Sequence, residues 1–68
     1  MNIKKLSTAL DCSQINIEKV KHQIVNVVEE LENDELMIDE LIHEVNKLIK
    51  YANELVYDVE EINDVFKQ

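Results

Sequence analysis

The 68-residue sequence contains no glycine, no proline, no tryptophan and no arginine. Folds rich in β-strands need glycine and proline at their turns, so this absence indicates an all-α chain with very few turns. Cys12 is the single cysteine, which excludes an intramolecular disulfide. Chains shorter than ~70–80 residues usually depend on disulfides, a metal, oligomerisation or near-ideal helix packing. Helix packing and oligomerisation are therefore the expected sources of stability.

Long apolar runs are absent as well. No segment approaches the ~18 apolar residues that span a membrane. The first residues, MNIKKLSTALDC, lack the apolar core of a signal peptide. A lone cysteine fits a reducing compartment. We therefore expect a cytoplasmic protein with no membrane partner.

A seven-residue repeat is what the sequence does contain. Apolar residues recur at spacings of three and four from Ile3 to Phe66, and with Ile3 at position a of a repeat abcdefg every a residue is apolar. Among the d residues only Ser13 and Asp34 are polar. A repeat sustained over about nine heptads is typical of a coiled coil or a helix bundle. The a residues are Ile3, Leu10, Ile17, Ile24, Leu31, Ile38, Val45, Ala52, Val59 and Phe66, and the apolar d residues are Leu6, Val20, Val27, Leu41, Leu48, Leu55 and Ile62.

The pair Asn33-Asp34 favours a break at the centre of this repeat. Asp34 would otherwise place a carboxylate in the apolar seam, where an unpaired charge is costly. Asn tolerates the left-handed conformation that ends many helices, and Asp is a strong cap for a following helix. We predict a single domain, residues 1–68, folded as an antiparallel helical hairpin with helices over about 2–32 and 35–67 and a turn at 33–34.

Two other arrangements fit the repeat. One is a continuous coiled-coil helix about 96 Å long. The other ends a short first helix at Asp11 or Ser13, because Asp11 and Gln14 resemble a capping box. For the hairpin, we expect a residues to face d residues, with the two residue numbers in each layer adding to 65. This register brings Ser13 opposite Ala52, and a register with sums of 72 also pairs a with d.

A second apolar stripe runs beside the a and d positions, mainly on the second half of the chain. A stripe this wide is expected in a bundle rather than in a two-stranded coil. We predict that it drives self-association into a homodimer, two hairpins forming a four-helix bundle. The alternative is a groove for a helix of another protein. The predicted self-association residues are Val28, Met37, Ile42, Ile49, Tyr51 and Val56.

Charge is distributed unevenly along the chain. The net charge is −8, and residues 29–68 carry thirteen acids against three lysines. One reading is a solvated outer face that keeps the protein soluble. The other is a surface that binds a partner protein with a basic patch. The predicted partner-binding residues, called the acidic cluster below, surround the turn: Glu29, Glu30, Glu32, Asp34, Glu35, Asp39, Glu40 and Glu44.

No pattern of catalytic or cofactor-binding residues is present. Glu40 and His43 have the Glu-x-x-His spacing of di-iron bundles, but they occupy the outward c and f positions. We therefore expect no enzyme activity, no cofactor and no metal. The predicted function is a small acidic helical protein–protein interaction module that self-associates and regulates a partner protein as an inhibitor, an adaptor or a chaperone. The alternative is an acidic nucleic-acid mimic that fills the basic cleft of a DNA- or RNA-binding protein, and it is motivated by the thirteen acids against three lysines in residues 29–68. We expect no direct binding to nucleic acid, because contacts with phosphates need Lys and Arg.

Overall fold

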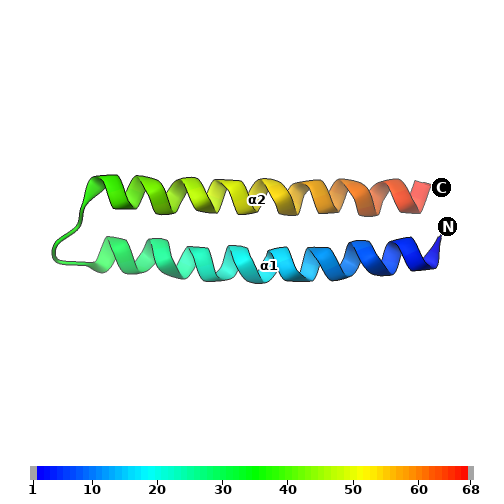
Figure 1. Cartoon of the computed structure of the whole chain (residues 1–68), viewed down its shortest axis with the longest axis horizontal. Coiled ribbons are helices and arrows are strands. Elements are labelled where there is room, and N and C mark those ends of the chain that lie inside the picture. The colour runs from blue at the N-terminus through cyan, green and yellow to red at the C-terminus, as the bar shows by residue number, and fades with distance from the viewer. Residues whose placement is uncertain (1, 68) are drawn as a thin grey trace.

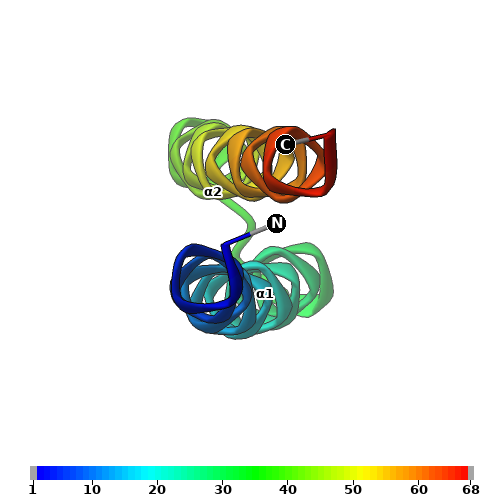
Figure 2. The same cartoon turned by 90° about the vertical axis from the view of Figure 1, so that its right-hand side faces the viewer.

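The computed structural model describes residues 2–67 as two antiparallel helices, α1 (Ile3–Glu32) and α2 (Ile38–Lys67), joined by a loop over residues 33–37 (Figure 1). Each helix has 30 residues, and the Cα trace measures 52 × 14 × 10 Å. Both chain ends lie at one end of the hairpin and the loop lies at the other. Seen end-on, the helices lie side by side and cross at a shallow angle (Figure 2). The predicted hairpin is confirmed, and the continuous helix is wrong.

Helix α1 begins at Ile3 because Asn2 caps it. Asn2 has an extended backbone, φ −93° and ψ 106°, and its Oδ1 accepts a hydrogen bond from the Lys5 N–H at 3.1 Å. Its carbonyl accepts from the Leu6 N–H at 3.0 Å, the first bond of the helical ladder. The helix then continues unbroken through residues 11–13, so a short first helix is also wrong.

The loop differs from the predicted turn in its conformation and its length. Asn33 is extended, with φ −73° and ψ 127°, and not left-handed. Its Oδ1 accepts from the Glu35 N–H at 3.0 Å, which turns the chain through a side-chain bond instead. Helix α2 begins at Ile38 and not near residue 35, so Asp34 does not cap it. Asp34 is exposed in the loop, which takes its carboxylate out of the seam.

The seam between the helices is formed by d and g positions on α1, where a and d were predicted. Ala9, Ser13 and Gln23 are buried on α1, and Val65 on α2 is 1% exposed. All five a residues of α1, Ile3, Leu10, Ile17, Ile24 and Leu31, are exposed. The side-chain hydrogen bonds across the seam join residues at g positions, Gln23 with Glu44 and Asn16 with Asp58. The residue numbers in these pairs do not add to 65 or 72, so neither pair belongs to a predicted register. The expected a-to-d layers are wrong for α1 because polar g side chains find partners across the seam.

Within residues 2–67, neither helix contains an 18-residue window apolar enough to cross a membrane. The two helices are amphipathic, and the seam between them contains both polar and apolar contacts along its length. Its mixed character decides which residues are left on the outside of the hairpin.

Candidate functional site

An apolar face runs along one side of the hairpin. Positions a and e lie about 40° apart on a helix of 3.6 residues per turn, beside the d and g positions that form the seam. Since the helices are antiparallel, the a and e positions of both fall on the same side. Twelve large apolar residues there are 43–66% exposed, and we call them the a/e face: Ile3, Leu10, Ile17, Ile24, Val28 and Leu31 of α1, and Ile38, Ile42, Ile49, Val56, Val59 and Phe66 of α2.

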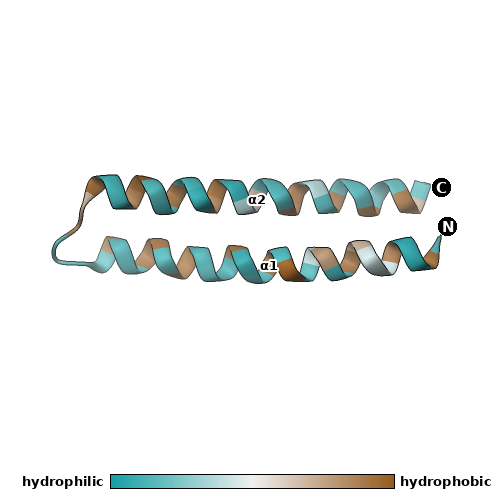
Figure 3. Ribbon diagram, in the orientation of Figure 1, coloured by the Kyte–Doolittle hydropathy of each residue, from teal (hydrophilic) through white to brown (hydrophobic). Residues whose placement is uncertain are grey.

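The a/e face is nearly free of charge, although polar residues interrupt its e positions at Ser7, Gln14 and Lys21 of α1 and at Asn63 of α2. Apolar residues recur from one end of both helices to the other (Figure 3). Lys21 is the single charged residue at an a or e position of the two helices, and its Nζ lies 3.6 Å from Glu18 Oε1. Scattered apolar residues are normal on a protein surface, but a contiguous patch marks an interaction site. If each residue exposes roughly 60–100 Å², the face covers on the order of 1,000 Å².

The seam, by contrast, contains a buried polar network. Gln23 is 3% exposed, and its Nε2 donates to the Glu44 backbone carbonyl at 2.8 Å and to Glu44 Oε2 at 2.6 Å. Asn26 Nδ2 donates to Gln23 Oε1 at 3.2 Å. Closer to the open end, Asn16 Nδ2 donates to Asp58 Oδ2 at 2.5 Å. These bonds place amides and carboxylates between the helices and leave the aliphatic a residues outside.

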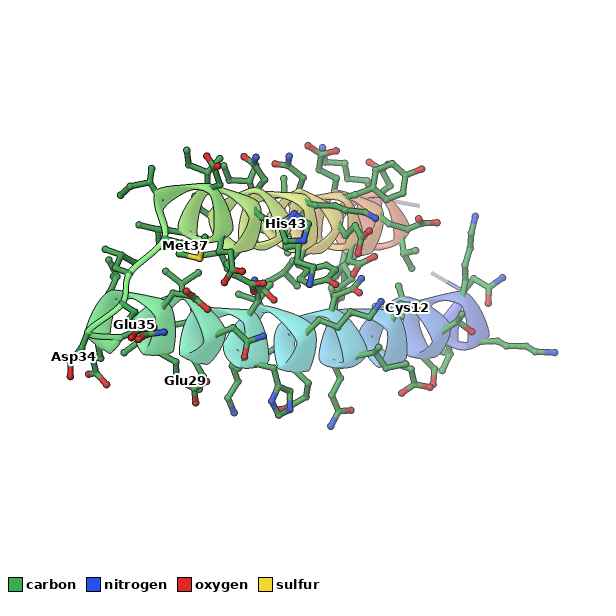
Figure 4. The ribbon with its side chains drawn as sticks, turned by 60° about the vertical axis from the view of Figure 1, so that its left-hand side comes forward. Cys12, Glu29, Asp34, Glu35, Met37 and His43 are labelled. Carbon is green, nitrogen blue, oxygen red and sulfur yellow. The ribbon has the colours of Figure 1, made fainter. Side chains whose placement is uncertain are left out.

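Five of the six predicted self-association residues are exposed: Val28, Met37, Ile42, Ile49 and Val56. Met37 lies in the loop (Figure 4). Tyr51 is the exception, because it is half-buried at the seam, with Lys19 Nζ 5.9 Å from the centre of its ring. The distance fits a cation–π contact. Tyr51 therefore supports the hairpin and lies off the a/e face.

The exposed a residues of α1 were missed as a site because the repeat assigned them to the seam. Two signals in the sequence pointed the other way. Asn16 and Gln23 occupy g positions on α1, where they can pair across a seam, and Ser13 weakens the d row. Both signals depend on finding partners on α2, which the sequence alone does not identify.

The acidic cluster lies at the loop end of the hairpin. Glu29, Glu32, Asp34, Glu35, Asp39 and Glu40 are exposed. Figure 4 shows Glu29 and Asp34 pointing away from α2. Glu30 and Glu44 are half-buried, and Glu44 also lies 3.9 Å from Lys47 Nζ besides binding Gln23. Glu30 and Glu44 therefore belong partly to the hairpin itself, and six carboxylates form the open acidic surface.

The remaining candidates for chemistry do not assemble. Glu40, His43 and Cys12 are all exposed. Among residues 2–67, no three His, Cys, Asp or Glu side chains come close enough together to hold a metal ion.

Comparisons with protein-family models, with curated proteins and with solved structures found no match. The a/e face and the acidic cluster are therefore the two features on which a functional proposal can rest.

Proposed function

We propose that this protein is a protein–protein interaction module that self-associates through its a/e face and regulates a partner protein. The observation that carries this proposal is the row of twelve half-exposed apolar residues along one side of the hairpin. Specific interfaces bury about 800 Å² on each partner. The a/e face is of that size, whereas an isolated hairpin would leave it in water at a cost in free energy.

Self-association is supported by the shape of the exposed surface. Two hairpins that stack their a/e faces form a four-helix bundle in which each copy buries the same surface. The bundle leaves the acidic cluster accessible at the loop end. A partner protein with a basic surface can then bind there, where the bundle acts as an inhibitor, an adaptor or a chaperone.

The double variant Ile42→Glu/Ile49→Glu tests the face directly. Both residues are 52% exposed in the hairpin, so the change leaves the seam intact and removes apolar contact between copies. Light scattering coupled to gel filtration should report twice the monomer mass for the unaltered protein and one monomer mass for the variant. Circular dichroism should report helix in both.

The matched control is Ile15→Glu/Tyr57→Glu. Ile15 and Tyr57 are 59% and 67% exposed but occupy f positions, away from the a/e face. The control carries the same added charge and should remain a dimer. A wild-type mass that stays monomeric at all concentrations, or a control that dissociates as readily as the face variant, contradicts self-association through this face.

The second candidate function is that of an acidic nucleic-acid mimic. It is favoured by the eight acids of the acidic cluster. These acids lie within residues 29–44, a segment that contains no lysine. A row of carboxylates can replace phosphates in the basic cleft of a nucleic-acid-binding protein, and such binding weakens as salt screens the charges.

Reversal of three exposed acids tests the acidic cluster, and competition by nucleic acid separates the two candidates. Glu32→Lys/Glu35→Lys/Asp39→Lys should abolish capture of a mimicked partner from host extract, and added DNA or RNA should compete for that partner. The control Glu60→Lys/Glu61→Lys/Asp64→Lys changes net charge equally at exposed residues elsewhere on α2. Capture that survives the first reversal, or that nucleic acid does not compete for, argues against mimicry.

A further inference from the structure

Two face-to-face hairpins can be arranged with their loops at the same end or at opposite ends. A two-fold axis along the bundle puts both loops at one end and sets α1 against α2 of the second copy. A two-fold axis across the bundle puts the loops at opposite ends and sets α1 against α1 and α2 against α2. Both arrangements bury the a/e face with antiparallel neighbours, so apolar contact alone does not choose between them.

The residues beside the face do choose. Position b follows e around the helix, on the side away from the seam, so b residues form the polar rim of any interface made by the a/e face. Lys4, Asp11, Glu18 and Glu32 are the charged b residues of α1, and Asp39, Glu60 and Lys67 are the charged b residues of α2. All seven are exposed in the hairpin, and Glu18 lies 3.6 Å from Lys21 of its own chain.

With the loops at the same end, every charged rim pair is repulsive. Helices of equal length aligned end to end bring residues whose numbers add to about 70 to the same level, within one residue or ~1.5 Å. Lys4 then meets the second copy's Lys67. Asp11 meets Glu60, and Glu32 meets Asp39. Each of these pairs occurs twice in the dimer. The two acidic clusters also lie at the same end and repel each other, although salt screens this repulsion beyond a Debye length of ~8 Å at physiological ionic strength.

With the loops at opposite ends, the charged corners become complementary. On α1 against α1 the numbers at one level add to about 35, so Lys4 meets the second copy's Glu32. On α2 against α2 they add to about 105, so Asp39 meets Lys67. The one like-charged pair is Glu18 with itself near the axis, and each Glu18 already has Lys21 of its own chain at 3.6 Å.

The interior does not choose between the arrangements, because each sets some polar e residues level with apolar ones. With the loops at opposite ends, Val28 lies level with Ser7 and Ile42 lies level with Asn63. Along α1, Ile17 faces Ile17 and Leu10 faces Ile24. The polar e residues Lys21 and Gln14 face each other. With the loops at the same end, Lys21 would instead lie level with the aliphatic Ile49.

We propose that a second copy of this chain covers the a/e face with its loop at the opposite end, related by a two-fold axis that crosses the helices near Ile17. This inference rests on the proposed self-association and adds its orientation. In this dimer the two acidic clusters lie at opposite tips of the bundle, so a basic partner can bind at each tip.

A single spin label on the loop tests the orientation. Cys12 is exposed and is replaced by serine, and Glu35→Cys carries the label. With the loops at opposite ends, two labels in one dimer should lie more than about 40 Å apart, since each 30-residue helix is ~45 Å long. With the loops together, they should lie within about 25 Å. Dilution with unlabelled protein should remove the signal in either case.

Charge reversal gives an independent test whose sign differs between the arrangements. Lys4→Glu should weaken the dimer about tenfold at low salt, because it sets like charges at two symmetric corners. With the loops together the same change would strengthen it, since the introduced carboxylate would face Lys67. The swap Lys4→Glu/Glu32→Lys should restore the original affinity. Lys50→Glu, at an exposed f position off the rim, controls for net charge.

The outcomes separate the two proposals. A protein that stays monomeric overturns self-association and the orientation with it. A dimer with a short label distance, in which Lys4→Glu tightens association relative to Lys50→Glu, overturns the orientation alone. A long distance with weakening by Lys4→Glu and rescue by the swap supports it.

Discussion

Gln23 and Ser13 show how differently two buried polar residues can contribute to one seam. Gln23 donates to the backbone carbonyl and to Oε2 of Glu44, at 2.8 and 2.6 Å, and accepts from Asn26. Among residues 2–67, the buried Ser13 Oγ has no hydrogen-bond partner. A buried polar group stabilises a fold when it is paired and costs free energy when it is not. The seam therefore has a satisfied layer and, about three turns away, an unsatisfied one.

Alanine substitutions at Gln23 and Ser13 should change the free energy of unfolding in opposite directions. Gln23→Ala should lower the free energy of unfolding by about 1–3 kcal/mol, because it removes the network and leaves a cavity. Ser13→Ala should raise it by up to ~1 kcal/mol, because the hydroxyl is no longer buried without a partner. Urea unfolding at one fixed protein concentration measures both values. Equal losses in the two variants would contradict this account of the seam.

The two helices differ in how their charges suit the helix dipole. Helix α2 has Asp39 and Glu40 in its first turn and Lys67 in its last, the favourable order. Helix α1 has no acid in its first turn and no base in its last, and Lys4 and Lys5 lie at its positive end. Helix α1 therefore depends on its Asn2 cap and on its packing against α2.

Substitutions of Asn2 should report this dependence. Asn2→Ala removes the bond to the Lys5 N–H and should lower the free energy of unfolding by ~1 kcal/mol. Asn2→Asp keeps the cap and adds a negative charge at the positive end of the dipole, so it should raise stability by ~0.3–1 kcal/mol at low salt. Thermal unfolding followed by circular dichroism measures the order Asp, Asn, Ala. Any other order would mean that the first turn does not limit stability.

In the proposed dimer, apolar attraction between the two copies would oppose their electrostatic repulsion. Each copy carries −8, so two copies repel at low ionic strength. The rim pairs are exposed, and exposed ion pairs contribute only ~0.2–1 kcal/mol each. In the proposed dimer the a/e face, on the order of 1,000 Å² per copy, would supply the larger favourable contribution to the free energy of association. Net repulsion, rather than the rim pairs, should therefore set the salt dependence.

Association should accordingly tighten as salt is added. Raising the ionic strength from ~10 to ~100 mM shortens the Debye length from about 30 to about 10 Å and screens the repulsion between copies. Sedimentation equilibrium at several protein concentrations would give the dimer dissociation constant at each salt. A dissociation constant that rises with salt would show that ion pairs, and not the a/e face, hold the copies together.

The sequence by itself determined the helices and the break between them. The absence of glycine and proline, the apolar repeat from Ile3 to Phe66 and the polar pair Asn33-Asp34 are local properties, and they act within a few residues. They predicted a first helix that ends at about residue 32, and α1 ends at Glu32. They did not predict the start of α2 at Ile38, because Asn33 turns the chain through its side chain and not through a left-handed backbone.

Only the tertiary structure decided which way α1 faces. The a, d and g positions could each contribute to a seam, and the repeat favoured a and d because they are apolar. The choice depended on pairs far apart in the chain: Gln23 with Glu44 and Asn16 with Asp58, 21 and 42 residues apart. Amides and carboxylates that bond across the seam satisfy each other when buried, so α1 turns its g residues inward. Its aliphatic a residues are left outside as the a/e face, which no local rule could reveal.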